Sequence, residues 1–208
     1  MISHKLEIIM SRAIKKANEL RHEYLTLEGI LLSLLDDGQV QTVLRECGAN
    51  ISDLDKELKT FIENPENCGV LTELQVKEIG GQQFADDELR EMAKQNGIEY
   101  QPEISLALQR VIQRAALHAQ SSGKEQILGI NILAAMYQEK ESFAIYLLRN
   151  QGVERLDILE CIAHDEDRSI NNGDYEDSDL NGKIEIDEKV DRSKIKKKSL
   201  LQEFAVNL

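Results

Sequence analysis

Residues 26–35 read TLEGILLSLL, and this stretch decides the fold class. Thr26 stands where a helix N-cap is expected, because its hydroxyl can accept a hydrogen bond from an unpaired N–H group of the first helical turn. The apolar run over Gly29–Leu35 is the longest in the chain, and it is far too short to span a bilayer. The stretch therefore predicts a short apolar helix inside a folded domain.

Helical spacing continues on both sides of this stretch. Before it, one predicted helix carries a stripe of apolar side chains: Leu6, Ile9, Met10, Ala13, Ile14 and Ala17. After it, a third helix is predicted around Val40–Cys47, with Gly48 as the residue that ends it. A fourth helix is predicted to start at Ser52 or Asp53.

The same plan returns after Pro102. With a shift of 102 positions, Arg12-Ala13 matches Arg114-Ala115 and Ile30-Leu31 matches Ile132-Leu133. With a shift of 104, Gly48 matches Gly152 and Leu44-Arg45 matches Leu148-Arg149. At the same shift, Leu54 matches Ile158 and Leu58 matches Ile162. Agreement in type and order across four helices predicts an all-α fold of two pseudo-symmetric four-helix repeats.

The repeats divide the chain into four parts: repeat 1 (1–62), a connector (63–102), repeat 2 (103–164) and a C-terminal linker (165–208). The repeats carry net charges of only −2 and −1, whereas the connector carries −6 and the linker −4. We expect the connector to be a polar surface excursion with one short amphipathic helix over 86–96. The linker has little to bury and is predicted to be flexible, and its more apolar ending at 201–208 is expected to lead into a further domain.

Composition narrows the function. The chain has 208 residues and a formal net charge of −13, which argues against nucleic acid or an anionic membrane as a partner. Three cysteines without metal-ligand spacing, and an N-terminus unlike a signal peptide, favour a reducing cytoplasm. The sequence lacks a phosphate-binding loop, so it predicts no nucleotide site, and it also lacks a nucleophile elbow of the Gly-x-Ser-x-Gly type.

Two metal hypotheses arise from the residues. His22, His118 and Glu63 could approach one another in the fold and hold zinc, although histidines at helix ends are the simpler reading. Residues 177–188 match an EF-hand calcium loop at its diagnostic positions: Asp177, Asp179, Asn181, Gly182 and Glu188. The alternative for this loop is an acidic linker, since the segment before Asp177 is a poor helix.

Two stretches resemble a known family. Residues 21–32 resemble the first-repeat signature of the Clp N-terminal domain, and residues 113–123 with 146–157 resemble the second repeat of ClpA-type domains. The ending at 201–208 is similar to the segment that leads into the first ATPase ring of these unfoldases. The family usually has a shorter connector than 63–102.

The resemblance implies a recognition module and no enzyme activity in this segment. It implies a mobile appendage, monomeric when isolated, on a hexameric unfoldase that feeds the ClpP peptidase, with ATP and Mg confined to ATPase domains outside this chain. The appendage would dock a ClpS-like adaptor that delivers protein substrates with N-terminal degradation signals. Carried over by position, the implied adaptor face consists of His22, Glu23, Thr26, Glu28 and Arg110.

Solvated acidic side chains near a helix N-terminus are the alternative reading of Glu23 and Glu28. If both instead serve the adaptor, both carboxylates should be available to a partner, and replacing them should leave folding intact. Direct binding of unfolded substrates and calcium binding at 177–188 are the alternative functions.

Overall fold

A computed structural model describes residues 2–84, 86, 91, 95 and 99–172. The chain divides into two units, Met1–Asn171 and Asn172–Leu208, and residues 173–208 lie outside the described residues. Side chains are described as far as Ala163. The calcium-loop hypothesis at 177–188 lies outside the described residues.

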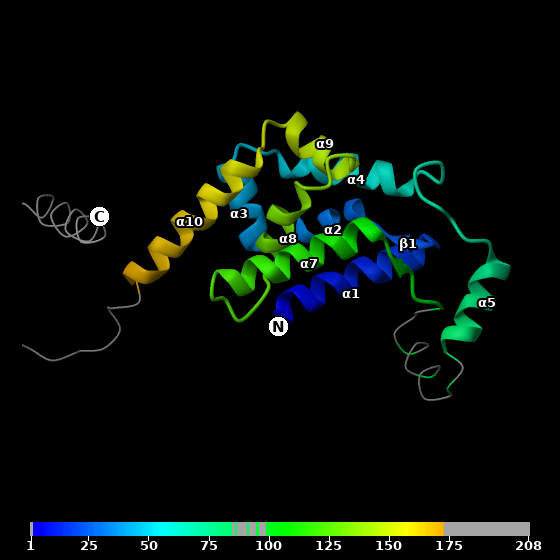
Figure 1. The fold of residues 1–208 in the computed structure, drawn as a ribbon. Coiled ribbons are helices and arrows are strands. Elements are labelled where there is room, and N and C mark those ends of the chain that lie inside the picture. The colour runs from blue at the N-terminus through cyan, green and yellow to red at the C-terminus, as the bar shows by residue number, and fades with distance from the viewer. Residues whose placement is uncertain (1, 85, 87–90, 92–94, 96–98, 173–208) are drawn as a thin grey trace, which may run out of the picture. The chain divides into compact units, whose positions relative to one another are not determined.

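The first unit consists of two four-helix repeats, as predicted (Figure 1). Repeat 1 contains α1 (His4–Glu19), α2 (Leu27–Leu34), α3 (Gly38–Glu46) and α4 (Ile51–Glu63). Repeat 2 contains α7 (Leu106–Ser121), α8 (Gly129–Met136), α9 (Phe143–Asn150) and α10 (Arg155–Asn172). Each of the first two helices of repeat 1 recurs 102 positions later with the same length.

The helix caps repeat with the helices. Ser3 caps α1 and Ser105 caps α7, in each case by accepting from the N–H group three residues later. Gly48 and Gly152 end α3 and α9 with φ of 86° and 78°, values that a residue with a side chain seldom adopts. The fourth helix starts at Ile51 rather than at Ser52 or Asp53, because the Asn50 side chain accepts from both of those N–H groups.

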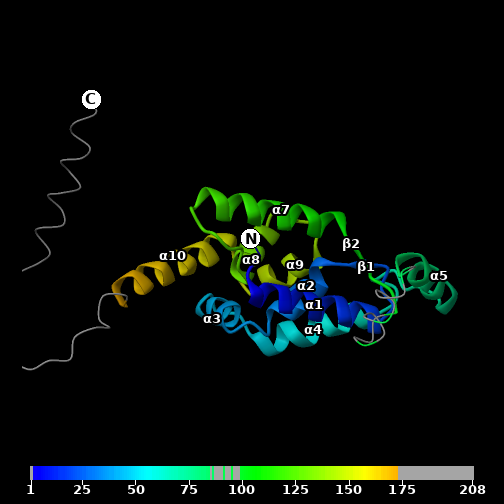
Figure 2. The same cartoon turned by 90° about the horizontal axis from the view of Figure 1, so that it is seen from below.

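The core is one continuous apolar cluster shared by both repeats. The short helices α2 and α8 contact each other and lie in the middle of the unit (Figure 2). α1 covers α2, α7 covers α8, and α3 also packs on α8. At the centre of this contact a Cβ on Gly129 would lie 3.0 Å from the Leu34 side chain, so a glycine permits the two repeats to approach closely.

The connector differs from the polar surface segment that was expected, because it contains a helix and buries apolar side chains. It contains α5 (Glu73–Gln83), which the sequence analysis missed and which begins with a capping box between Thr72 and Gln75. The predicted helix at 86–96 falls mostly outside the described residues. Three buried connector side chains form a small second apolar cluster: Leu71, Val76 and Tyr100.

Polar contacts fix this cluster to the end of α1. The Tyr100 hydroxyl donates to the His22 carbonyl at 2.7 Å, and the Leu71 N–H donates to the Arg21 carbonyl at 2.7 Å. Arg21 follows the end of α1 with a positive φ of 56°. The equivalent position in repeat 2 is Gly123, with a φ of 67°. Next to these contacts, strand β1 (Tyr24–Leu25) pairs in parallel with β2 (Glu103–Ile104).

Two neighbouring glycines of α5 test whether the connector is docked. A Cβ on Gly80 would meet the Glu99 carbonyl oxygen at 2.2 Å, whereas a Cβ on Gly81 would meet nothing within 4 Å. Gly80→Ala should therefore displace the 99–100 segment and speed amide hydrogen exchange there. Gly81→Ala should leave exchange at 99–100 unchanged and stabilise α5 by up to about 1 kcal/mol, because alanine is the better helix former. Equal exchange in the two variants would contradict the docking.

Candidate functional site

The backbone of Glu23 is hydrogen-bonded to two distant segments of the chain. Its N–H donates to the Gly69 carbonyl at 2.9 Å, and its carbonyl accepts from the Glu103 N–H at 3.0 Å. The side chain is exposed, and a hydrogen bond from the Tyr24 hydroxyl to its carboxylate raises the pKa of Tyr24. A charged group on a fixed backbone can pair with a cationic partner at low cost in conformational entropy.

Glu28 has a different environment, and the expectation of an available carboxylate was wrong for it. Only 8% of the residue is exposed. Its Oε1 accepts from the Ser142 hydroxyl at 2.8 Å and from the Ala144 N–H at 3.3 Å, at the start of α9. A carboxylate is stabilised at a helix N-terminus by the unpaired N–H groups and the helix dipole. Glu28 therefore ties α2 of repeat 1 to α9 of repeat 2.

His22 and Thr26 also carry structural contacts. The predicted N-cap is confirmed, since the Thr26 hydroxyl accepts from the Gly29 N–H at 3.4 Å. His22 is buried, and burial lowers its pKa despite a hydrogen bond to the backbone of Ile62. Because a lowered pKa favours the neutral ring at pH 7, His22 supplies no charge to a partner.

Arg110 belongs to an ion-pair group on repeat 2. Its guanidinium donates twice to Glu139, at 2.6 and 3.2 Å, and Arg114 binds the same carboxylate. The two guanidinium groups hold the pKa of Glu139 at about 2, well below its ordinary value. The matching Arg12 of repeat 1 pairs with Asp36, so both repeats have an ion pair from this arginine, although Asp36 is far more exposed than Glu139 and aligns with Gln138.

The structure brings three of the five implied residues together. Thr26, Glu28 and Arg110 line one groove of about 460 Å³ between the start of α2, the start of α7 and the α8–α9 loop. The same groove is lined by Ser105, Lys140 and Glu141 among others. Glu23 precedes Thr26 by three positions and is not part of the lining, and His22 is buried apart from it.

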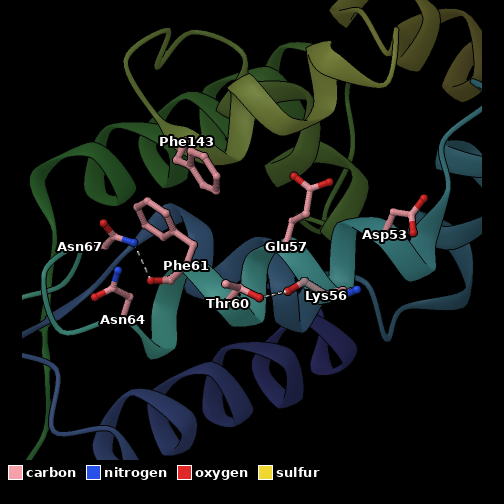
Figure 3. A pocket seen from close by; sticks show the side chains of 8 residues that line it. All are labelled: Asp53, Lys56, Glu57, Thr60, Phe61, Asn64, Asn67 and Phe143. Atoms are coloured by element: carbon pink, nitrogen blue, oxygen red, sulfur yellow. Dashed lines mark hydrogen bonds between the residues drawn. The ribbon is translucent and has the colours of Figure 1, made fainter.

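The structure contains a second groove that was not predicted from the sequence. It has a volume of about 560 Å³ and lies along α4 and its following turn, beneath the start of α9 (Figure 3). The rings of Phe61 and Phe143 stack with centroids 4.2 Å apart, and Tyr146 stacks on Phe143 at 5.7 Å. The sequence holds only nine Phe and Tyr residues, so a third of its aromatic rings meet here. Phe61 and Phe143 lie 82 positions apart, and no local signal links them.

The remaining lining of the second groove is polar. Asp53 and Glu57 lie toward one end, with Lys56 beside them, and Asn64 and Asn67 lie at the other end (Figure 3). Asn67 donates to the Phe61 carbonyl at 3.1 Å, which fixes the turn against α4. The groove thus combines a flat aromatic centre with a predominantly acidic end.

The zinc hypothesis fails for the described part of the chain. Among those residues no group of His, Cys, Asp and Glu side chains is arranged to hold a metal ion. His22 is hydrogen-bonded to Ile62, Glu63 pairs with Lys16 at 3.5 Å, and His118 lines a separate small pocket with Arg155. No helix among the same residues is long and apolar enough to cross a membrane.

The two helical repeats place the chain in a known protein family. The model of the Clp repeat N-terminal domain family matches residues 1–68 and 58–151, and the chain belongs to this family. Over 163 residues it is 37% identical to a ClpA homolog protein of Fuscovulum blasticum, which confirms the predicted resemblance to ClpA-type domains. The match covers 78% of this chain but 17% of that relative, so the chain spans about a sixth of the relative's length.

Solved structures confirm the fold. The N-domain of ClpV from Vibrio cholerae superposes with a TM-score of 0.56 at 16% identity, covering 78% of this chain and 83% of that one. The Hsp104 N-terminal domain from Candida albicans gives 0.56 at 11% identity, with coverages of 79% and 91%. A ClpV N-domain in complex with a VipB peptide gives 0.53 at 17% identity, with coverages of 78% and 84%.

Acid should weaken the domain through Glu139, whose side chain is 11% exposed. Its pKa in the folded chain is about 2 against an ordinary 4.5, so its contribution is complete above about pH 5 and is lost as the pH falls toward 2. Glu139→Gln should lower the free energy of unfolding at pH 7 by about 1–2 kcal/mol and flatten its fall between pH 5 and 2. Urea melts across this range measure the effect, and the exposed Glu141→Gln is the control. A parallel acid profile in both variants would contradict this role for Glu139.

Proposed function

We propose that the two repeats form the docking module of a ClpA-type, ATP-driven unfoldase, and that the module binds a ClpS-like adaptor. In the whole protein this module would serve a hexamer that uses ATP and Mg in its ATPase domains and passes substrates to ClpP in the cytoplasm. The family assignment and the ClpA homolog support this proposal. The docking module itself supplies recognition and leaves the chemistry to other domains.

One observation carries the adaptor assignment: the exposed Glu23 carboxylate on its fixed loop. Gly69 and Glu103 form hydrogen bonds with the backbone of Glu23. Thr26, three positions later in the chain, lines the first groove. A partner with a Lys or Arg opposite Glu23 could place an adjoining segment along that groove. Charge pairing of this kind contributes mainly to specificity and to the rate of association.

Within this proposal the five implied residues separate into two roles. Glu23 is the contact residue, and Arg110, whose side chain is 53% exposed, is available at the edge of the groove although it is paired with Glu139. His22, Thr26 and Glu28 shape the face from within, through the contacts described above. A charge reversal at Glu28 would disturb the packing of the repeats, so it does not report on adaptor binding.

Two matched charge reversals test the adaptor face. Glu23→Lys should weaken binding of a ClpS-like adaptor at least tenfold, because it removes an attraction and adds a repulsion. Glu57→Lys makes the same charge change on α4 and should leave adaptor affinity unchanged. Isothermal titration gives both affinities, and circular dichroism checks that both variants melt like the parent chain. Unchanged affinity in Glu23→Lys would place the adaptor face elsewhere.

The lining of the second groove suits an additional role for the domain, which is direct binding of unfolded protein segments. The ClpV N-domain that has been solved with a VipB peptide has a similar fold, which supports peptide binding by domains of this architecture. Stacked aromatic rings in a concave surface suit a large apolar side chain, and exposed rings are frequent anchors in interfaces. The acidic end next to them suits a Lys or Arg of the same segment.

The spacing along α4 defines the preferred segment. Glu57 and Asp53 precede Phe61 by one and two helical turns, which places them about 6 and 12 Å along the helix axis. An extended peptide advances about 3.3 Å per residue. The preferred segment therefore carries an aromatic residue with cationic residues two and four positions to one side.

A labelled peptide with this pattern tests the second role. A ten-residue peptide with Phe at one position and Arg two and four positions away should bind several-fold more tightly than the same peptide with Glu in place of Arg. Phe143→Leu, which keeps an apolar side chain but removes the ring, and Glu57→Lys should each weaken binding several-fold. Glu23→Lys should have no effect on fluorescence anisotropy of this peptide. If Glu23→Lys weakens the peptide as much as Glu57→Lys does, the two grooves are not separate sites.

A further inference from the structure

Two of the three cysteines lie together, although 114 positions separate them in the chain. The Sγ atoms of Cys47 and Cys161 are 3.7 Å apart, and both side chains are partly exposed. The third cysteine, Cys68, is buried in the connector. A pair of thiols in contact but not bonded is the geometry from which a disulfide forms with small side-chain movements, since the S–S bond length is about 2.05 Å.

The backbone on each side of the pair is held in place. Cys47 ends α3 immediately before Gly48, whose positive φ and the bond from the Ala49 N–H to the Leu44 carbonyl (2.8 Å) fix the turn. The Asn50 N–H then donates to the Gln151 side chain at 2.7 Å, which joins this turn to the one before α10.

Cys161 is equally fixed on its own helix. It lies on α10 between the core residues Ile158 and Ile162, and Ile162 is its immediate neighbour. The two sulfur atoms are therefore brought together by the packing of repeat 1 against repeat 2.

We propose that Cys47 and Cys161 form a reversible intramolecular disulfide that links the end of α3 in repeat 1 to α10 in repeat 2 when the chain meets a disulfide oxidant. In a reducing compartment the pair remains two thiols. The cross-link is a modification site additional to both docking grooves, and its formation does not depend on the proposed function.

The reaction proceeds by two exchanges. One cysteine of the pair, as its thiolate, attacks one sulfur of the oxidant and expels one thiolate, which leaves a mixed disulfide on that cysteine. The other cysteine then loses its proton and attacks the sulfur of the first, expelling the second thiolate. Two cysteine thiols are oxidised by two electrons in total, and the oxidant is reduced to two thiols that take up the two protons.

Burial, followed by the contact with Cys161, raises the pKa of Cys47. Because the thiolate is the attacking species, this shift slows the reaction of Cys47 with the oxidant at neutral pH.

Oxidised glutathione applied to the full 208-residue chain tests the proposal. Intact mass should show the loss of two hydrogen atoms, and alkylation should find one remaining free thiol, at Cys68. Peptide mapping without reduction should identify the link between Cys47 and Cys161. The melting temperature should rise by about 5 °C and return on addition of a reductant. Hydrogen exchange in α10 should slow in the oxidised form.

Single substitutions separate the proposed route from other thiol chemistry. Cys68→Ser should form the cross-link as the parent does. Cys47→Ser and Cys161→Ser should each stop at a glutathione adduct on the remaining cysteine of the pair. Three free thiols after oxidation, a link that includes Cys68, or disulfides only between two chains would each overturn the proposal. Mapping of the parent chain decides these outcomes even if a variant folds poorly.

Discussion

The fold depends on the mutual burial of two short apolar helices. α2 and α8 have eight residues each, and nearly every side chain on them is buried. Helices of this length are marginal in water on their own, so each persists only because other helices cover it. The contact between them, with Gly129 against Leu34, joins the repeats into one core. The caps, the terminating glycines and the ion pairs of Arg12 and Arg114 then fix the surrounding helices around this pair.

Some of the acidic side chains serve to hold the folded repeats together. Glu28 and Glu139 have carboxylates turned toward internal partners, one at the start of α9 and the other between two guanidinium groups. Glu23 lies only five positions before Glu28, yet its side chain is exposed, and its carboxylate accepts a hydrogen bond from the neighbouring Tyr24. Two acidic residues that look equivalent in the sequence thus differ in the structure, because Glu28 is buried at a contact between the repeats and Glu23 is exposed.

The connector contributes to the face as well as linking the repeats. Its acidic composition suggested a solvated excursion, but Tyr100 and Leu71 bind the backbone at His22 and Arg21, and Gly69 binds Glu23. The segments that position the candidate docking loop are therefore drawn from both ends of the connector. A change in connector sequence would be expected to alter the loop without touching any contact residue.

The sequence by itself determined the all-α repeat architecture, because apolar spacing, caps and positive-φ glycines are local signals that recur at shifts of 102 and 104 positions. It also identified Thr26 as a cap, and the family that explains the repeat. Only the tertiary structure decided which carboxylates are exposed, how Phe61 contacts Phe143 and how Cys47 contacts Cys161. Those relations join residues far apart in the chain, and their geometry depends on how the two repeats pack, which no local pattern encodes.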